Sequence, residues 1–392
     1  MKKYSILIVG LKCYGGHIRE FIVNLKKKNP QVEISLLTTG LKDDFIEDIK
    51  QSVDHMVVLR QRSRMRIPHL AGLLNKVYYY WAFLKLYFRG HFDIVDIHYP
   101  TPFVRQAMPI LKRLTPNIVI TPWGSDVMRV DDEKNIKYLT QIYSQASHVT
   151  VGRDSQIGQV IMSKFNVNPS KMVKLGWGGE FFDFIQEHSN NITTEDAKAR
   201  FGLGGRYVIT CGYNTQQAQR HEDIMKAISC VKTQLPNNLT ILIPSTYVPY
   251  DSLSEQKRQY VDSLKEIGKA LGLEVTIVQE HLDLVDLLKL RMATDIFVHV
   301  QSSDAGSRSV MEYVFCNKKI VHGAWISYAY LEDYKPSCYF PVNQLEDLGA
   351  VILKASQSQI NDLPHEVKTI ILERGWNHKM AQWNSFFESL VS

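Results

Sequence analysis

The sequence lacks the features of a membrane-spanning or disulfide-stapled protein. None of its apolar runs approaches the roughly 18 residues that a helix needs to cross a bilayer. The chain has five cysteines, an odd number, and no two of them form a Cys-x-x-Cys pair. Scattered thiols within apolar runs are typical of buried, reduced cysteines, and clustered metal ligands are missing. We therefore expect a cytoplasmic protein that is not integral to a membrane and binds no metal.

Acidic residues are also missing from one long interval, between Asp54 and Asp93. Within it, the segment 60–89 mixes aromatic residues with seven cations, namely Arg60, Arg62, Arg64, Arg66, Lys76, Lys85 and Arg89. Cations and amphipathic rings together suit an anionic membrane surface, so we expect possible peripheral contact at the inner face of the plasma membrane. The alternative is a helix that packs on a sheet and has a solvated basic edge. No recognised motif for nucleic-acid binding accompanies the segment, and we expect no such partner.

The length of 392 residues exceeds what one hydrophobic core usually accommodates, which favours two domains. Short apolar runs alternate with amphipathic segments, a pattern typical of βαβ units and parallel sheets. The pattern is interrupted by a stretch rich in glycine and asparagine and then restarts. The sequence therefore predicts an α/β protein with a Rossmann-like domain at 1–175, a linker at 176–205 and a second Rossmann-like domain at 206–375.

The end of the chain predicts one more helix. Apolar residues recur there at alternating spacings of four and three, which places them on one helical face, at Trp376, Met380, Trp383, Phe387 and Leu390. Two arrangements are open: the helix packs on its own domain, or it crosses back to the first domain.

The strongest chemical signal is the segment from Asp304 to Glu312, which follows an apolar strand and opens a helix. Ligands of open α/β sheets bind beyond the carboxyl ends of the strands, and the amide groups at a helix start favour phosphate. Gly306 and Ser307 allow a close approach of the backbone. Glu312 can accept hydrogen bonds from vicinal hydroxyls such as those of a ribose. The alternative is that Asp304 merely caps a helix.

This acid-x7-Glu segment, continued by 316–321, resembles the E-x7-E segment of retaining glycosyltransferases of the GT-B fold, family 4. It departs from the family in two places, because the first acid is Asp304 and the usual Gly-x-Pro-Val is Asn-Lys-Lys-Ile-Val. Other motifs resemble the family in chain order, and they are Gly15-Gly16, the strand 93–99, the segment 121–126, the strand end 208–214 and the helix start 219–223. Trp123 stands where the family has a histidine, and Arg220 stands in a lysine position.

The resemblance implies two Rossmann-like domains that face each other across a cleft, with the C-terminal helix crossing back to the first domain. It implies retaining transfer of a sugar from a nucleoside-diphosphate sugar to a glycan or lipid-linked acceptor, in bacterial surface polysaccharide synthesis, without a metal or another cofactor. The implied catalytic residues are Asp304, His98 as the nearest substitute for the missing histidine, and Asp126. The implied donor-binding residues are Gly15, Gly16, Arg220, Gly306, Ser307, Arg308 and Glu312.

Two other functions are compatible with the sequence. A sugar-nucleotide epimerase of the same fold would turn over the donor without an acceptor. A non-catalytic protein that binds a sugar nucleotide would not turn it over, and the missing histidine and the missing arginine after Gly212 are compatible with that.

Overall fold

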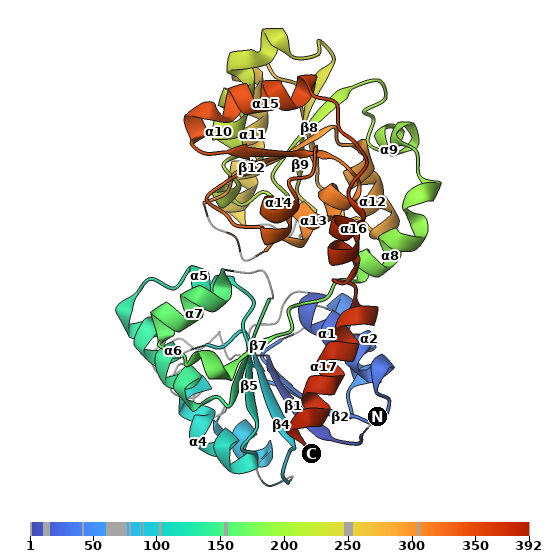
Figure 1. Cartoon of the computed structure of the whole chain (residues 1–392). Helices are drawn as coiled ribbons and strands as arrows, with labels where there is room; N and C mark the ends of the chain where they lie inside the picture. The colour runs from blue at the N-terminus through green and yellow to red at the C-terminus, as the bar shows by residue number, and fades with distance from the viewer. Residues whose placement is uncertain are drawn as a thin grey trace. The chain divides into compact units, whose positions relative to one another are not determined.

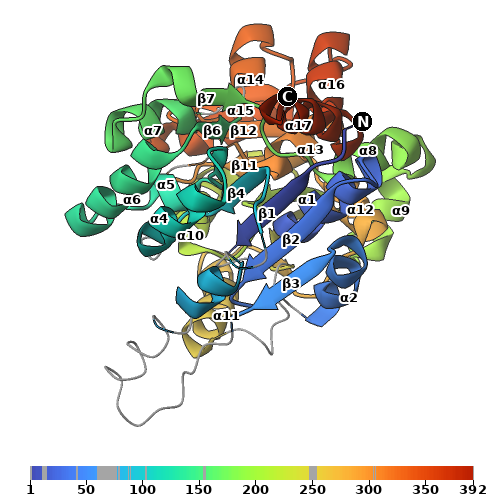
Figure 2. The same ribbon diagram turned by 90° about the horizontal axis from the view of Figure 1, so that it is seen from below.

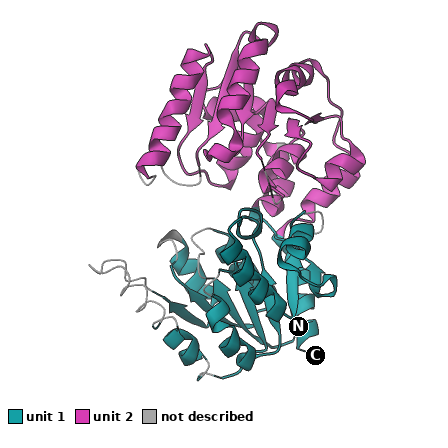
Figure 3. Cartoon of the chain, turned by 90° about the vertical axis from the view of Figure 1, so that its left-hand side faces the viewer, with its two compact units in different colours: residues 1–180, 376–392 teal, residues 181–375 magenta. Residues whose placement is uncertain are grey.

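A computed structural model of the chain describes residues 2–10, 16–40, 43–59, 77, 80–86, 88, 90–101, 104–152, 156–246, 254–302, 304 and 306–391. The chain divides into two compact units (Figure 3). Unit 1 comprises Met1–Glu180 and Trp376–Ser392, and unit 2 comprises Phe181–Gly375. None of the described helices is long and apolar enough to span a bilayer.

Unit 1 is built on a parallel sheet with the strand order β3-β2-β1-β4-β5-β6-β7. The order reverses beside β1, as in a Rossmann fold, and Figure 2 shows β3, β2, β1 and β4 in this sequence. The strands are β1 (Ser5–Gly10), β2 (Glu33–Thr38), β3 (His55–Val58), β4 (Ile94–His98), β5 (Ile118–Thr121), β6 (His148–Val151) and β7 (Met172–Lys174). The helices are α1 (Gly16–Lys28), α2 (Asp43–Ser52), α4 (Val104–Leu114), α5 (Ser125–Met128), α6 (Glu133–Gln145), α7 (Ile157–Phe165) and α17 (Trp376–Leu390).

The C-terminal helix α17 belongs to unit 1, as the resemblance implied. Its apolar face buries Trp376, Trp383 and Phe387 in the same core as Phe21 of α1 and the strands β1 and β2. The indole nitrogen of Trp383 donates to the carbonyl of Gly176 at 3.0 Å. Figure 1 draws α17 alongside α1. Packing on its own domain, the alternative that the spacing left open, is therefore wrong.

Unit 2 is built on a second parallel sheet, with the order β10-β9-β8-β11-β12-β13. One core covers each face, because β8, β9 and β11 alternate their apolar side chains between α10 and α15 on one face and α12 and α13 on the other. The strands are β8 (Tyr207–Cys211), β9 (Leu239–Pro244), β10 (Val275–Val278), β11 (Ile296–His299), β12 (Lys319–Gly323) and β13 (Tyr339–Val342). The helices are α8 (Glu180–His188), α9 (Thr194–Arg200), α10 (His221–Val231), α11 (Glu255–Ala270), α12 (Leu284–Ala293), α13 (Arg308–Phe315), α14 (Ala329–Tyr334), α15 (Leu348–Gln357) and α16 (His365–Leu372).

The segment 176–205, which the sequence predicts to be a linker, differs from that prediction. It contains α8 and α9, and Phe181, Phe182 and Ile185 of α8 are buried in the core of unit 2. The run of apolar residues in α8 is short, and glycines precede it and asparagines follow it in the sequence. These flanking residues favoured the prediction of a linker. The chain passes from unit 1 to unit 2 between Glu180 and Phe181.

Several residues named in the sequence analysis lie outside the described residues. They are Cys13, Gly15 and six cations of the segment 60–89, namely Arg60, Arg62, Arg64, Arg66, Lys76 and Arg89.

Candidate functional site

The central strands β8 and β11 of unit 2 form the switch point of its sheet, from which the chain leaves toward opposite faces. A network of hydrogen bonds ties their carboxyl ends together. The side-chain amide of Gln219 donates to Gln301 Oε1 at 2.7 Å, and Gln219 Oε1 accepts from the amide nitrogen of Tyr213 at 3.4 Å. Gly212 has a φ of 63°, and a Cβ there would lie 2.7 Å from Gln219 Oε1, so this turn requires glycine. Open α/β sheets bind ligands beyond the carboxyl ends of the strands at such a switch point.

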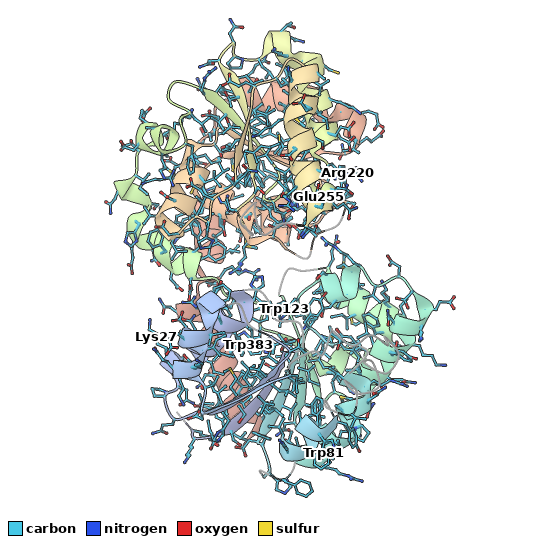
Figure 4. All side chains as sticks on the ribbon, turned by 180° about the vertical axis from the view of Figure 1, so that it is seen from behind. Lys27, Trp81, Trp123, Arg220, Glu255 and Trp383 are labelled. Atoms are coloured by element: carbon cyan, nitrogen blue, oxygen red, sulfur yellow. The ribbon has the colours of Figure 1, made fainter. Side chains whose placement is uncertain are left out.

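Arg220 follows this network directly and precedes α10. Its backbone is left-handed, with a φ of 58°. The guanidinium carbon lies 5.8 Å from the centre of the Trp325 ring, within the range of a cation–π interaction. The indole nitrogen of Trp325 in turn donates to the carbonyl of Gln301 at 2.7 Å. Arg220, labelled on unit 2 in Figure 4, is thus held at the carboxyl ends of β11 and β12 rather than placed as an isolated solvated residue.

Asp304 lies between β11 and α13 and makes several contacts through one oxygen. Its Oδ2 accepts from the amide nitrogen of Ser307 at 3.1 Å and from the hydroxyl of Tyr328. The nearby Gly306 turns the loop with a φ of 96°. Asp304 therefore closes the loop that precedes α13, whereas the N-cap residue of α13 is Ser307, whose side chain makes no capping hydrogen bond. Because the Ser307 amide is already hydrogen-bonded within the protein, Ser307 can offer a ligand only its hydroxyl. Arg308 is the first residue of α13.

Glu312 is buried on α13 and forms an ion pair that the sequence analysis missed. Its Oε2 accepts from Nε of Arg291 at 2.9 Å and from Nη2 at 2.8 Å. Arg291, on α12, also donates to the Tyr313 hydroxyl at 3.0 Å. A ligand of Glu312 must therefore share the carboxylate with a buried guanidinium, which fixes the rotamer of Glu312.

Two buried histidines lie directly behind Asp304. His299 and His322 are paired residues of β11 and β12, and their rings stack with centroids 5.3 Å apart. Neither ring makes a hydrogen bond to any described residue, although His299 Nε2 lies 3.4 Å from Asp304 Oδ2. Burial, and after it the neighbouring His299, lower the pKa of His322 to about 3, against the opposing effect of Asp304. The signal for this pair was a histidine at the end of each of two apolar strands.

His98 of unit 1, a predicted catalytic residue, lies at the end of β4 and is fully buried. Its Nε2 lies 2.9 Å from Asp96 Oδ2, and Asp96 Oδ1 accepts from the Thr121 hydroxyl at 2.7 Å. The His98 ring packs among aromatic rings, with its centroid 4.9 Å from that of Phe21 and 5.4 Å from that of Trp177. Its surroundings are those of a buried, paired histidine.

Asp126, the other catalytic prediction in unit 1, folds the loop in which it lies. Its Oδ1 accepts from the amide nitrogens of Trp123 at 2.9 Å and Gly124 at 2.8 Å. Burial raises the pKa of Asp126 to about 6, against the opposing effect of these backbone hydrogen bonds. Its Oδ2 has no hydrogen-bond partner among the residues that the structure describes.

His17 is a further residue of unit 1 that the sequence analysis missed. It follows Gly16, the first residue of α1, and is only partly buried. Its ring centroid lies 5.4 Å from that of Trp123 and 6.0 Å from that of Trp177. The signal was its place directly after the glycine loop.

The predicted site residues thus belong to both units. Arg220, Asp304, Gly306, Ser307, Arg308 and Glu312 belong to unit 2, and Gly16, His98 and Asp126 belong to unit 1. Within the described ranges, no three His, Cys, Asp or Glu side chains are grouped so that they could hold a metal ion.

Comparison with known proteins shows the fold. The sequence matches no protein-family model and no curated protein. The structure is similar over the whole of both chains to a glycosyltransferase from Rickettsia africae, with 15% identity and a TM-score of 0.69. It is similar to Anabaena HepE in complex with UDP and glucose, at 13% identity and a TM-score of 0.66, covering 98% of this chain and 100% of that one. It is also similar to sucrose-phosphate synthase from Thermosynechococcus elongatus, at 13% identity and a TM-score of 0.69, covering 99% of each chain.

These likenesses define the class of fold. Both parallel sheets and the returning helix are those of the GT-B fold that such glycosyltransferases share, and the expected fold class is confirmed.

Proposed function

We propose that the chain is a glycosyltransferase that transfers a sugar, with retention, from a nucleoside-diphosphate sugar to a glycan or lipid-linked acceptor in surface polysaccharide synthesis. The observation that carries this proposal is the grouping in unit 2. A cation, an acid and a helix start with a second acid lie at the carboxyl ends of β8, β11 and β12. The shared fold supports it.

The chemistry requires stabilisation of a leaving group. When the bond between the sugar and the phosphate breaks, negative charge develops on the nucleoside diphosphate. In this proposal Arg220 and the start of α13 stabilise that charge, because a guanidinium and the amides of a helix start both attract a phosphate. The same groups supply the positive charge that a metal ion would otherwise bring, so we propose a metal-independent reaction without another cofactor. Asp304 lies beside the donor sugar, and Glu312 binds the ribose.

The first experiment tests the diphosphate role. Isothermal titration with UDP, GDP and ADP should identify a nucleoside diphosphate that binds. Arg220→Ala should weaken that binding about 10- to 100-fold, since hydrogen bonds to charged groups contribute about 1.5–3 kcal/mol. Arg206→Ala is the matched control, because Arg206 is a partly exposed arginine of unit 2 that forms an ion pair with Glu274. Unchanged binding in Arg220→Ala would remove the proposed site.

The second experiment tests the ribose role without a mutation. Replacing Glu312 would leave Arg291 buried without its partner, so the change is better made on the ligand. A 2′-deoxy form of the bound diphosphate should bind the wild-type protein about tenfold more weakly. Equal affinity for both forms would argue against a ribose at Glu312. With an intact nucleotide sugar, release of diphosphate only in the presence of an acceptor distinguishes a transferase from an epimerase and from a binding protein.

We also propose that unit 1 contacts an anionic membrane, which suits a lipid-linked acceptor. Among the described residues of the segment 60–89, Trp81 is 58% exposed and Phe88 is 79% exposed, and Figure 4 shows Trp81 at the outer edge of unit 1. Aromatic rings beside cations favour the headgroup region. Trp81→Ser with Phe88→Ser should reduce sedimentation with vesicles of phosphatidylcholine and phosphatidylserine. Tyr334→Ser, at a 44% exposed residue of unit 2, is the control. Equal sedimentation of both variants would oppose the proposal.

A further inference from the structure

We infer that Tyr328 is a positioning residue that holds the carboxylate of Asp304 in its working orientation. The inference rests on the proposed function, because it concerns the acid of the proposed donor site. Tyr328 directly precedes α14, 24 residues along the chain from Asp304, and its side chain is buried. No sequence motif marks it.

The hydroxyl of Tyr328 bridges the two ends of the loop that carries Asp304. It accepts from the amide nitrogen of Ser307 at 2.8 Å. A hydroxyl has a single proton, so with the Ser307 amide as donor that proton points at Oδ2 of Asp304. Oδ2 of Asp304 therefore accepts from two donors, the Tyr328 hydroxyl and the Ser307 amide. Tyr328 thus fixes the orientation of the Asp304 carboxylate.

The ring of Tyr328 is itself held in place by three aromatic neighbours. Its centroid lies 4.9 Å from that of His322, 6.0 Å from that of Tyr330 and 6.2 Å from that of His299, and all three contacts are edge-to-face. Edge-to-face packing fixes the direction of the phenol. The two buried histidines thus support the ring of Tyr328 by packing against it, and they compete for none of its hydrogen bonds.

The groups that face Asp304 come from three elements. They are the phenol of Tyr328 before α14, the imidazole of His299 at the end of β11, and the Ser307 amide before α13. Behind them lie His322 of β12 and the hydroxyl of Tyr330 on α14. Burial, and then the charge of Asp304, raise the pKa of Tyr328 well above its usual value, so the phenol keeps its proton across the working pH range.

Tyr328→Phe and Tyr330→Phe form a matched pair of variants. Each removes one hydroxyl from a buried tyrosine of the same loop and helix, but the Tyr330 hydroxyl has no hydrogen-bond partner in the described chain. In the ligand-free protein at pH 7, Tyr328→Phe should unfold at a lower midpoint than Tyr330→Phe by about 4 °C. That gap should narrow as Asp304 becomes protonated at low pH, because the phenol stabilises the carboxylate more than the neutral acid, while the part that comes from the Ser307 amide remains. Equal midpoints at pH 7, or a gap that is constant with pH, would overturn the inference.

Turnover provides the second readout. A panel of UDP-glucose, UDP-galactose and GDP-mannose, measured as diphosphate release in the presence of an acceptor glycan, gives kcat and KM for the donor. Tyr328→Phe should lower kcat about tenfold or more and leave KM within twofold, and the acidic limb of its pH profile should move to higher pH because Asp304 takes up a proton more readily. Tyr330→Phe should match the wild type. If the wild type binds UDP or GDP but Tyr328→Phe and Tyr330→Phe have identical kinetics, the role of Tyr328 is refuted and the proposed donor site is not. Absence of nucleotide binding by the wild type refutes the proposed donor site and the inference with it.

Discussion

Both units place histidines and acids at the carboxyl ends of their central strands, but the two groups are organised in opposite ways. In unit 1, Nε2 of His98 pairs with Asp96 at 2.9 Å inside the core, and Nδ1 of His98 has no hydrogen-bond partner among the described residues. In unit 2, His299 and His322 face each other, and the nearby Asp304 is held by a tyrosine and a backbone amide instead. The comparison teaches that the acid of unit 1, which is paired with a buried histidine, has a structural role. In unit 2, by contrast, the acid is oriented by a phenol and a backbone amide of the surrounding loops.

The largest expected effect concerns Glu312. It is a buried, paired acid like Asp96, but it belongs to the proposed site of unit 2. Glu312→Ala leaves a buried guanidinium without its partner and should lower the free energy of unfolding by about 3–5 kcal/mol. Removing both charges, as Arg291→Met with Glu312→Leu, should cost less than the single change, because no unpaired charge remains. Urea denaturation of the three proteins measures this. A double variant that is less stable than Glu312→Ala would contradict the account.

The next effect breaks the paired side of the comparison. His98→Phe keeps an aromatic ring among Phe21 and Trp177 but removes the partner of the buried Asp96. We expect a loss of about 2–4 kcal/mol in the free energy of unfolding, the cost of leaving a buried carboxylate partly unsatisfied. Chemical denaturation at pH 7 checks it. A loss under about 1 kcal/mol would mean that Asp96 does not depend on His98.

Asp126 sharpens the contrast with Asp96 through its pH dependence. Burial raises the pKa of Asp126 in the folded protein to about 6, from its ordinary value of 3.8. Ionised Asp126 therefore opposes folding, so its unfavourable contribution is full well above pH 6 and disappears as the pH falls toward 4. Asp126→Asn, which can still accept from the amides of Trp123 and Gly124, should be more stable than the wild type at pH 8 by about 2 kcal/mol.

Melting curves of Asp126→Asn and the wild type between pH 5 and 8 test this directly. The advantage of the variant should shrink toward pH 5. An advantage that grows at low pH would have the wrong sign and would remove burial as the dominant cause.

The sequence predicted the parts of the fold that depend on local periodicity. The alternation of short apolar runs and amphipathic segments predicted both parallel sheets, and the four–three spacing predicted α17 with its buried Trp376 and Trp383. The Asp304–Glu312 spacing located the start of α13. The pairing of Asp96 with His98 could also have been predicted, because residues two apart in a strand share a face.

The remaining site contacts depend on packing between distant segments. Arg291 has an ordinary place in the amphipathic pattern of α12, and only the packing of α12 against α13 brings it to Glu312. Tyr328 reaches Asp304 from beyond the next strand. Short helices such as α8 were missed because flanking glycines and asparagines outweighed three buried apolar residues. The roles of His98, Asp126 and the donor-binding residues in catalysis stay predictions.

The smallest expected effect breaks the unpaired side of the comparison, with the same replacement as in unit 1. Neither ring nitrogen of His322 makes a hydrogen bond within the described part of the chain, and its low pKa of about 3 keeps the ring neutral at pH 7. His322→Phe therefore removes two unsatisfied polar atoms and keeps the ring contacts with His299 and Tyr328, so the free energy of unfolding should change by less than about 1 kcal/mol. The same denaturation measurement as for His98→Phe applies, and the difference between the two variants is the quantity of interest. A loss in His322→Phe as large as in His98→Phe would mean that the buried imidazole does bind a polar partner, such as an ordered water, and the contrast between the units would fail.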